Sequence, residues 1–412
     1  MRGGDEMTDE HAVRLLRPLR GEPEEPSRID VPRAMTEGRK RRALRRWSGG
    51  VALIALTSVT AGGGTLAMSA LRDEAPLPAP TTAVSVTPSV AAAVPAVPAG
   101  PSGCEVARLP TDGVKKALVT AGDPSGRYLA GRVYQSSVST IIWKDGKIFA
   151  RPRMTGGDPS YEDINTSGVA VGSAFIGERQ QAYVFRDGRV TALDGQRTRA
   201  NAINEAGVIV GAMGEVLETV PVRWSSPGAK MERLPLPAGY VEGQADGIAE
   251  NGTVVGSISK GGTDVPTAYL WPPGGAGYAM PLPTVKGVKA SGFWAESIND
   301  GWVAGRAVFE EDGKRGSRRF ESLRYRIADR TYQSLPVNSY PALLADNGWI
   351  LMGPQAGPVV IAGSGVTELP RYARLKEYVI SSFSADGRVA AGYTTDLDDE
   401  GVGNEPLLWT CR

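Results

Sequence analysis

The residue types that carry most protein chemistry are scarce in this chain. Its 412 residues include two cysteines, Cys104 and Cys411, and one histidine, His11. Because no histidine follows His11, the rest of the chain cannot form a histidine metal site, a Ser-His-Asp triad or a Cys-His pair. His11 itself is best explained as a solvated residue. We therefore expect no bound metal, no cofactor and no histidine-dependent catalysis.

Carboxylates are the remaining candidates for catalysis or metal binding. Asp396, Asp398, Asp399 and Glu400 lie close together near the C-terminus. They could bind Ca²⁺, but their spacing differs from that of an EF-hand loop, and a solvated acidic loop is the simpler interpretation. Paired carboxylates can also cleave glycosidic bonds. An extracytoplasmic hydrolase or lyase therefore stays an alternative, although no motif places two carboxylates in one pocket.

Three tryptophans are the candidate binding residues. Trp302 and Trp349 occupy the same position in two adjacent copies of a repeat, and Trp294 lies nearby in sequence. Equivalent tryptophans on neighbouring units could form an aromatic platform for a sugar ring or a peptide. Packing between the units is the alternative interpretation.

The N-terminal part of the chain predicts a membrane anchor. Residues 1–47 are polar and end in the basic sequence GRKRRALRRW, whereas residues 48–71 contain no charge. Such a stretch can cross about 30 Å of hydrocarbon as a helix. Because the basic residues precede it, the N-terminus is expected in the cytoplasm and the C-terminus outside the plasma membrane. A cleaved signal peptide is the alternative, but residues 1–47 are much longer than an ordinary signal-peptide n-region.

The next segment predicts a linker. Residues 72–103 are rich in proline, alanine, valine and threonine. They have no hydrophobic periodicity, so they cannot build a core and are expected to form a semi-extended stalk. The formal net charge of the whole chain is +1, which provides no field that would favour nucleic acid.

Residues 104–412 repeat one unit. Each copy has a glycine, a short aliphatic run and a second glycine, as in SGVAVG, AGVIVG and NGTVVG. Later in each copy comes a strand-like run that usually ends on an aromatic residue, and then a run that often ends in Leu-Pro. The glycine pairs are Gly126 and Gly131, Gly168 and Gly172, Gly207 and Gly211, Gly252 and Gly256, Gly301 and Gly305, Gly348 and Gly353, and Gly387 and Gly392.

This repeat predicts a β-propeller. A period of roughly 40–45 residues with four short strands is typical of a propeller blade. A single four-stranded sheet has two faces to bury, and stacking blades radially covers both. Asn-Gly, Asp-Gly and Ser-Gly steps favour tight turns. We therefore predict an all-β, seven-bladed propeller, preceded by one transmembrane helix and the Pro/Ala-rich linker.

The positions of the two cysteines predict how the ring closes. The seventh copy stops at LLWTCR and lacks a Leu-Pro strand, whereas CEVARLP supplies such a strand before the first copy. The N-terminal strand is therefore expected to complete the last blade. Aligned on the second copy, Cys411 falls on Asp187 and Cys104 on Gly188, at a hairpin turn. A disulfide would replace the missing chain connection, and two unrelated buried thiols are the alternative.

The copies resemble the HAF-type extracellular repeat of bacterial proteins, in which Ile-Asn precedes a Gly-x-Val-Val-Gly run and His-Ala-Phe precedes an aliphatic-Trp pair. AINEAGVIVG at 202–211 matches the first half, and QAYVF and TAYLW match the second. Gln181 and Thr267 replace the histidine, so no role of that histidine is carried over. The N-terminal segment is similar to those of actinobacterial membrane-anchored proteins. The resemblance implies a propeller and no particular chemistry.

These features together predict a non-catalytic binding or sensing module at the cell surface. The expected ligand is a protein, a peptide or a cell-wall glycan, held by the loops at 309–319 and 396–404 with Trp302 and Trp349 as anchors. Residues 1–47 are a candidate site for a cytoplasmic partner. A membrane-tethered regulator of a transcription factor is therefore a further alternative, without a zinc domain.

Overall fold

The computed structural model describes residues 97–215, 218–261, 265–310, 318–395 and 403–412. The predicted cytoplasmic segment, the predicted membrane span, most of the predicted linker and the acidic residues 396–400 lie outside the described residues. The described part contains no helix that is long and apolar enough to span a membrane.

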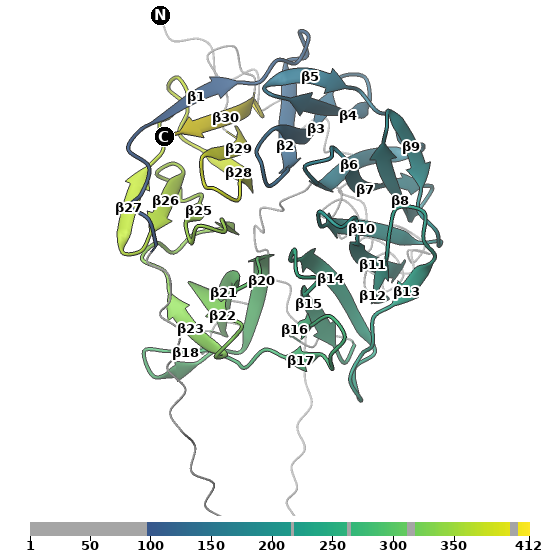
Figure 1. Ribbon diagram of the computed structural model, residues 1–412, viewed down its shortest axis with the longest axis vertical. Helices are drawn as coiled ribbons and strands as arrows, with labels where there is room; N and C mark the ends of the chain where they lie inside the picture. Colours follow the sequence, from purple (N-terminus) through teal and green to yellow (C-terminus); the bar gives the residue numbers. More distant parts are fainter. Residues whose placement is uncertain (1–96, 216–217, 262–264, 311–317, 396–402) are drawn as a thin grey trace, which may run out of the picture. The chain divides into compact units, whose positions relative to one another are not determined.

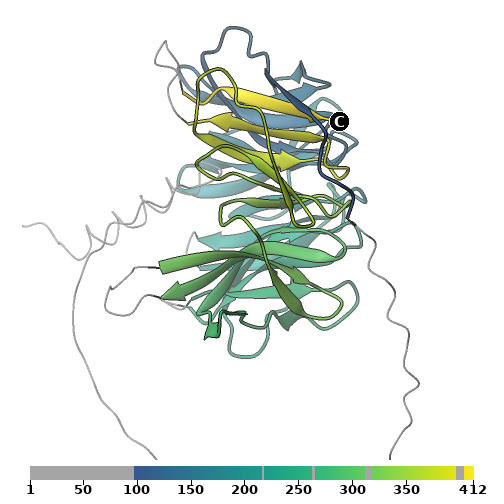
Figure 2. The ribbon, with the colours of Figure 1, turned by 90° about the vertical axis from the view of Figure 1, so that its left-hand side faces the viewer.

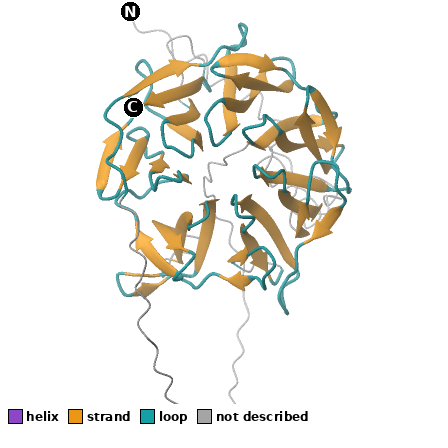
Figure 3. Cartoon of the chain, in the orientation of Figure 1, coloured by secondary structure: helices purple, strands orange, loops and turns teal. Residues whose placement is uncertain are grey.

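Seven four-stranded antiparallel sheets form a ring of blades, as predicted (Figures 1 and 3). Blades 1 to 3 consist of β2 (Lys116–Gly122), β3 (Tyr128–Tyr134), β4 (Val138–Lys144) and β5 (Lys147–Ala150); β6 (Gly157–Ile164), β7 (Ala170–Ile176), β8 (Arg179–Arg186) and β9 (Arg189–Ala192); and β10 (Thr198–Ile203), β11 (Ile209–Glu215), β12 (Glu218–Trp224) and β13 (Met231–Arg233).

Blades 4 and 5 consist of β14 (Glu242–Ile248), β15 (Val254–Ser259), β16 (Thr267–Trp271) and β17 (Tyr278–Ala279); and β20 (Gly292–Ile298), β21 (Trp302–Glu310), β22 (Arg318–Arg326) and β23 (Thr331–Ser334). A small hairpin, β18 (Thr284–Val285) and β19 (Val288–Lys289), connects them. Blade 6 consists of β24 (Ala342–Leu344), β25 (Ile350–Met352), β26 (Val359–Ala362) and β27 (Gly365–Glu368). Blade 7 consists of β28 (Tyr378–Phe383), β29 (Val389–Thr394), β30 (Pro406–Cys411) and β1 (Cys104–Arg108).

The strand order gives the ring two distinct rims. In each blade the first strand lies nearest the centre and the fourth lies outside (Figure 1). We call the side with the first-to-second and third-to-fourth strand connections, such as residues 204–208 and 187–188, the turn rim. The side with the second-to-third strand connections and the links between blades, such as residues 177–178 and 193–197, is the loop rim.

The second glycine of the repeat marks a close backbone contact. In six blades the register between the first two strands shifts at a β-bulge, as between Ala200 and Ala202. A Cβ added to the glycine opposite each bulge would lie 2.0–2.2 Å from a carbonyl oxygen of the first strand. The glycines concerned are Gly131, Gly172, Gly211, Gly256, Gly305 and Gly392. The bulge therefore explains why the repeat requires glycine there.

Blade 6 departs from this rule and corrects one alignment made from the sequence. Its first two strands pair without a register shift, with Ala342 opposite Met352. Met352 therefore stands where the other blades have the second glycine, and Gly353 lies one residue later. A Cβ on Gly353 would meet no atom closer than 3.4 Å. The absence of a bulge in this blade removes the need for glycine.

Indole hydrogen bonds join neighbouring blades and explain the aromatic and Leu-Pro positions of the repeat. In four blades the tryptophan of the third strand donates its indole N–H to a backbone carbonyl of the preceding blade. This carbonyl belongs to the residue after the leucine at the Leu-Pro position of the repeat. The bonds are Trp143 to Pro110 (2.7 Å), Trp224 to Asp194 (2.9 Å), Trp271 to Pro235 (2.8 Å) and Trp409 to Pro370 (2.8 Å). Each bond satisfies a buried donor and fixes the spacing of two blades.

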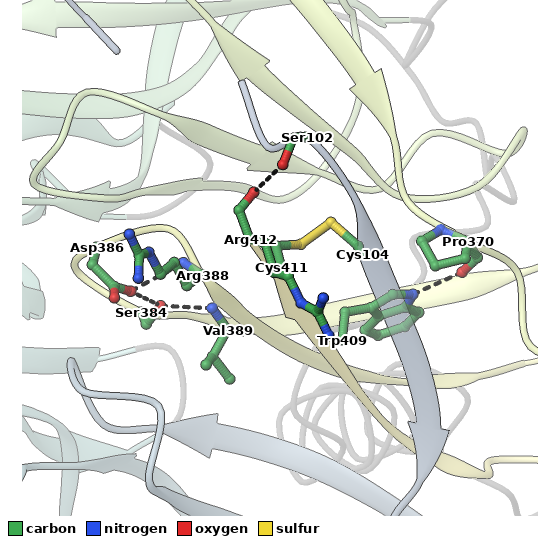
Figure 4. The surroundings of a disulfide bond; sticks show 10 residues. All are labelled: Ser102, Cys104, Pro370, Ser384, Asp386, Arg388, Val389, Trp409, Cys411 and Arg412. Atoms are coloured by element: carbon green, nitrogen blue, oxygen red, sulfur yellow. Dashed lines mark hydrogen bonds between the residues drawn. A yellow bond between two sulfur atoms is a disulfide. The ribbon is translucent and has the colours of Figure 1, made fainter. Parts of the chain in front are cut away.

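The predicted ring closure is confirmed. β1 pairs with β30 in the register Cys104 opposite Cys411, and a disulfide joins the two residues (Figure 4). The Trp143–Pro110 bond then ties this closing strand to blade 1. Among the described residues, seven hydrophobic clusters form the core of the ring. The described residues therefore include all seven blades and the core that they share.

One buried hydroxyl between blades 1 and 2 makes a stability prediction possible. Tyr161 is 0% exposed, and its hydroxyl has no hydrogen-bond partner among the described residues. Burial raises the pKa of this phenol far above its ordinary value. Because the unpaired hydroxyl is a net cost, Tyr161→Phe should raise the free energy of unfolding by about 1 kcal/mol in urea denaturation.

Tyr183 is the matched control for that substitution. It belongs to the same hydrophobic cluster, and its hydroxyl donates to the Thr155 carbonyl at 2.9 Å. Tyr183→Phe should therefore lower the free energy of unfolding by about 1 kcal/mol. Equal effects of the two substitutions would contradict this account of Tyr161.

Candidate functional site

The structure separates the three candidate tryptophans between the two rims. Trp302 is the first residue of β21, the second strand of blade 5. Because second strands begin at the turn rim, Trp302 lies there. Trp349 precedes β25 and lies at the turn rim as well. Trp294 is near the start of β20 and lies toward the loop rim. The expectation that Trp302 and Trp349 share a rim with the second-to-third strand loops is therefore wrong.

The surroundings of Trp302 and Trp349 indicate packing. The guanidinium carbons of Arg324 and Arg326 lie 4.4 and 5.5 Å from the ring centre of Trp302. Trp349 is 6% exposed and donates its indole N–H to the carbonyl of Pro98 at 3.1 Å. Among the described residues, no aromatic contact joins the two tryptophans. They do not form a shared aromatic platform.

Trp294 belongs to a mixed group that we call the aromatic–arginine cluster, consisting of Trp294, Arg306, Phe320 and Tyr340. The rings of Trp294 and Phe320 are 5.3 Å apart. The Arg306 guanidinium lies 5.6 Å from Trp294, 5.0 Å from Phe320 and 4.1 Å from Tyr340. All four residues are half-buried. One cation thus faces three rings, an arrangement that holds the rings in fixed positions.

Glu296 fixes the position of the central arginine. Its carboxylate contacts the Nε of Arg306 at 2.5 Å, and its other oxygen accepts the backbone N–H of Ala342 in blade 6 at 3.0 Å. Burial raises the pKa of Glu296 to about 7, and the charge of Arg306 opposes that rise. The cluster therefore combines side chains from blade 5 and from the link to blade 6 around one ion pair, and Glu296 holds it at that junction.

A second polar network lines the first strands of blades 2 to 4. Arg199 donates to the amide oxygen of Gln244, whose amide nitrogen donates to Asp246 at 2.7 Å. Glu162 and Asp246 both interact electrostatically with Arg199. Burial raises the pKa of Glu162 and raises that of Asp246 to about 7. Because Glu162 and Asp246 are bulge residues on different blades, this network links inner strands far apart in sequence.

The sequence analysis missed the partners of Trp294. Arg306, Glu296 and Tyr340 are scattered through two copies of the repeat. One signal was present, because Arg132 and Arg306 both follow the second glycine, where the other bulged copies have serine, alanine or tyrosine. Arg132 is buried and, like Arg306, forms an ion pair, in its case with Asp158 of the next blade. An arginine at this position therefore indicates a junction between blades.

The loop rim also carries an open depression of about 560 Å³ at blades 2 and 3, lined by Ile176, Glu178, Arg179, Gln180, Gln181, Gln196 and Arg197. Gln181 stands where the resembling repeat has histidine. Its amide donates to the carbonyls of Ala182 and Leu193, both at 3.1 Å. Its role is therefore to hold the third and fourth strands together. Among the described residues, no group of carboxylates, cysteines or histidines is placed to hold a metal ion.

Among the comparisons with known proteins, only the one with solved structures shows a similarity. No protein-family model matches the sequence. No curated protein matches it either. Among solved structures, the chain is similar to one described as "YCF48 bound to D1 peptide", with 13% sequence identity and a TM-score of 0.46. The similarity covers 77% of this chain and 97% of the other.

Proposed function

We propose that this protein is a single-pass membrane protein whose extracytoplasmic propeller binds a ligand without transforming it. The ligand contacts the loop rim at blades 5 to 7. The observation that carries this proposal is the half-buried aromatic–arginine cluster, which lies at the loop rim in a ring without histidine. Tryptophan, tyrosine and arginine are the residue types that dominate binding energy in protein interfaces.

The shape of the loop rim supports the same region. β21 and β22, the second and third strands of blade 5, are nine residues each, whereas their equivalents in blade 6, β25 and β26, are three and four residues. The long hairpin of blade 5 extends on the side away from the C-terminus (Figure 2). A rigid ring that presents connections of different length on one rim is a common arrangement for binding. A protein, a peptide or a cell-wall glycan fits this chemistry.

The test compares substitutions on the two rims. Trp294→Ala in a soluble chain of residues 75–412 should lower retention on isolated cell walls, or on immobilised envelope proteins, at least tenfold. Trp302→Ala on the turn rim should leave retention unchanged. Both variants should melt within a few degrees of the parent, because neither residue is fully buried. Retention that is insensitive to Trp294→Ala would refute the assignment of the ligand to this cluster.

The location needs its own measurement. A reporter that is active only outside the cytoplasm, fused after Arg412 of the full chain, should be active in cells. The basic residues before the uncharged stretch 48–71 are the reason for this expectation. Cytoplasmic activity of the fusion would refute the orientation, and release of a soluble chain beginning near residue 71 would replace the anchor with a cleaved signal peptide.

A further inference from the structure

The last residues of the predicted linker, 97–103, pack against the propeller. Val97 packs against the hydrophobic cluster of blades 6 and 7 and lies against Gly348. Gly100 lies against Thr367 and Ala362, the latter at the end of β26. Residues 97–103 therefore run along blade 6 before the chain enters blade 7 as β1. The sequence predicts a semi-extended stalk for these residues.

Trp349 makes this contact specific. Its indole N–H donates to the carbonyl of Pro98, and the ring itself is 6% exposed. On its other side the ring meets Gly387 so closely that an added Cβ would lie 2.4 Å from it. The indole therefore lies between the linker and the turn of blade 7, and its N–H is bonded to the linker.

Blade 6 makes with the linker the kind of bond that four other blades make with their neighbours. The third-strand tryptophans of blades 1, 4 and 7 each donate to a proline carbonyl. Blade 6 has Ile361 at that position, opposite Ile350. Its tryptophan is instead at Trp349, and the proline carbonyl comes from the linker. A proline-rich segment is already extended, so docking it costs little conformational entropy.

We propose that Trp349 and Gly348 form a docking site for the Val-Pro segment of the linker, residues 97–100. This site joins linker and propeller rigidly at the turn rim. Since the turn and loop rims lie at opposite ends of the strands (Figure 2), the docked linker leaves from the side opposite the aromatic–arginine cluster. The docking itself does not depend on the proposed function. The orientation that follows from the docking does depend on the proposed function, because a linker anchored in the membrane would make the loop rim face away from the membrane.

The test uses ¹⁹F NMR of the soluble chain of residues 75–412 labelled with 5-fluorotryptophan. Trp349→Phe assigns the resonance of Trp349. Replacing residues 97–100 with Gly-Ser-Gly-Ser should shift this resonance and increase its solvent isotope effect, because the indole loses its cover. The same replacement at residues 85–88, farther along the linker, should leave it unchanged.

The remaining indole resonances show whether the ring stays folded, since Trp143 and Trp409 report the blade junctions next to the closing strand. Val97→Ser is a milder variant that should move the Trp349 resonance in the same direction. An unchanged Trp349 resonance after replacement of residues 97–100 would overturn the docking site. Because the measurement needs neither a membrane nor a ligand, its failure is distinct from a failure of the proposed function.

Discussion

Replacing both Cys104 and Cys411 with serine should lower the free energy of unfolding by up to about 5 kcal/mol, the largest effect that we expect from any substitution here. The disulfide joins residues 307 positions apart. Its loss would restore much conformational freedom to the unfolded chain, while the folded ring keeps the same strands. Guanidinium denaturation followed by fluorescence measures the change, and far-ultraviolet circular dichroism should show unchanged strand content.

The control is the parent protein treated with a reducing agent, which should unfold at the same denaturant concentration as the serine variant. Mass spectrometry without reduction should find a peptide pair linked through the two cysteines. Stability that does not change on reduction would contradict the role of the bond, and two free thiols in the native protein would refute the bond itself.

Gly211→Ala should lower the free energy of unfolding by about 3 kcal/mol, although it adds only one methyl group. A Cβ at this position would lie 2.0 Å from the carbonyl oxygen of Arg199, a contact that the backbone cannot accommodate without moving. The bulge beside it, between Ala200 and Ala202, would have to open. Urea denaturation of the soluble chain measures the loss.

Gly353→Ala is the matched control, because its nearest contact would be 3.4 Å away. It should change the free energy of unfolding by no more than about 0.5 kcal/mol. If both alanine variants lower the free energy of unfolding equally, the close contact at the bulge is not the reason why the repeat has glycine at this position.

Much of this architecture could be predicted because it repeats. The turn glycines and the aromatic and Leu-Pro runs recur with a period, so their spacing indicates blades and their incomplete final copy indicates where the ring closes. The alignment of Cys104 and Cys411 on one hairpin position follows from that same period, and the observed register confirms it.

The candidate site could not be predicted in the same way, because it depends on contacts between copies. Arg306 reaches Tyr340 across a junction of two blades, and no spacing within one copy relates them. The sequence also showed that Trp302 and Trp349 are equivalent without showing at which end of the strand they lie. Met352 shows a further limit, because Gly353 fits the sequence pattern of the repeat and only the strand pairing identifies Met352 as the equivalent position.

The position of the disulfide also determines how the ring responds to a pulling force. Cys104 is the first residue of β1, and its partner Cys411 is the last residue of β30. A pull on the N-terminal side would detach residues 97–103 first and then reach this covalent bond before any backbone hydrogen bond between β1 and β30. Unzipping from that end is blocked, so the load passes into two strands of blade 7 together. The disulfide thus gives the interrupted blade the covalent resistance to force that a hairpin turn gives the other blades.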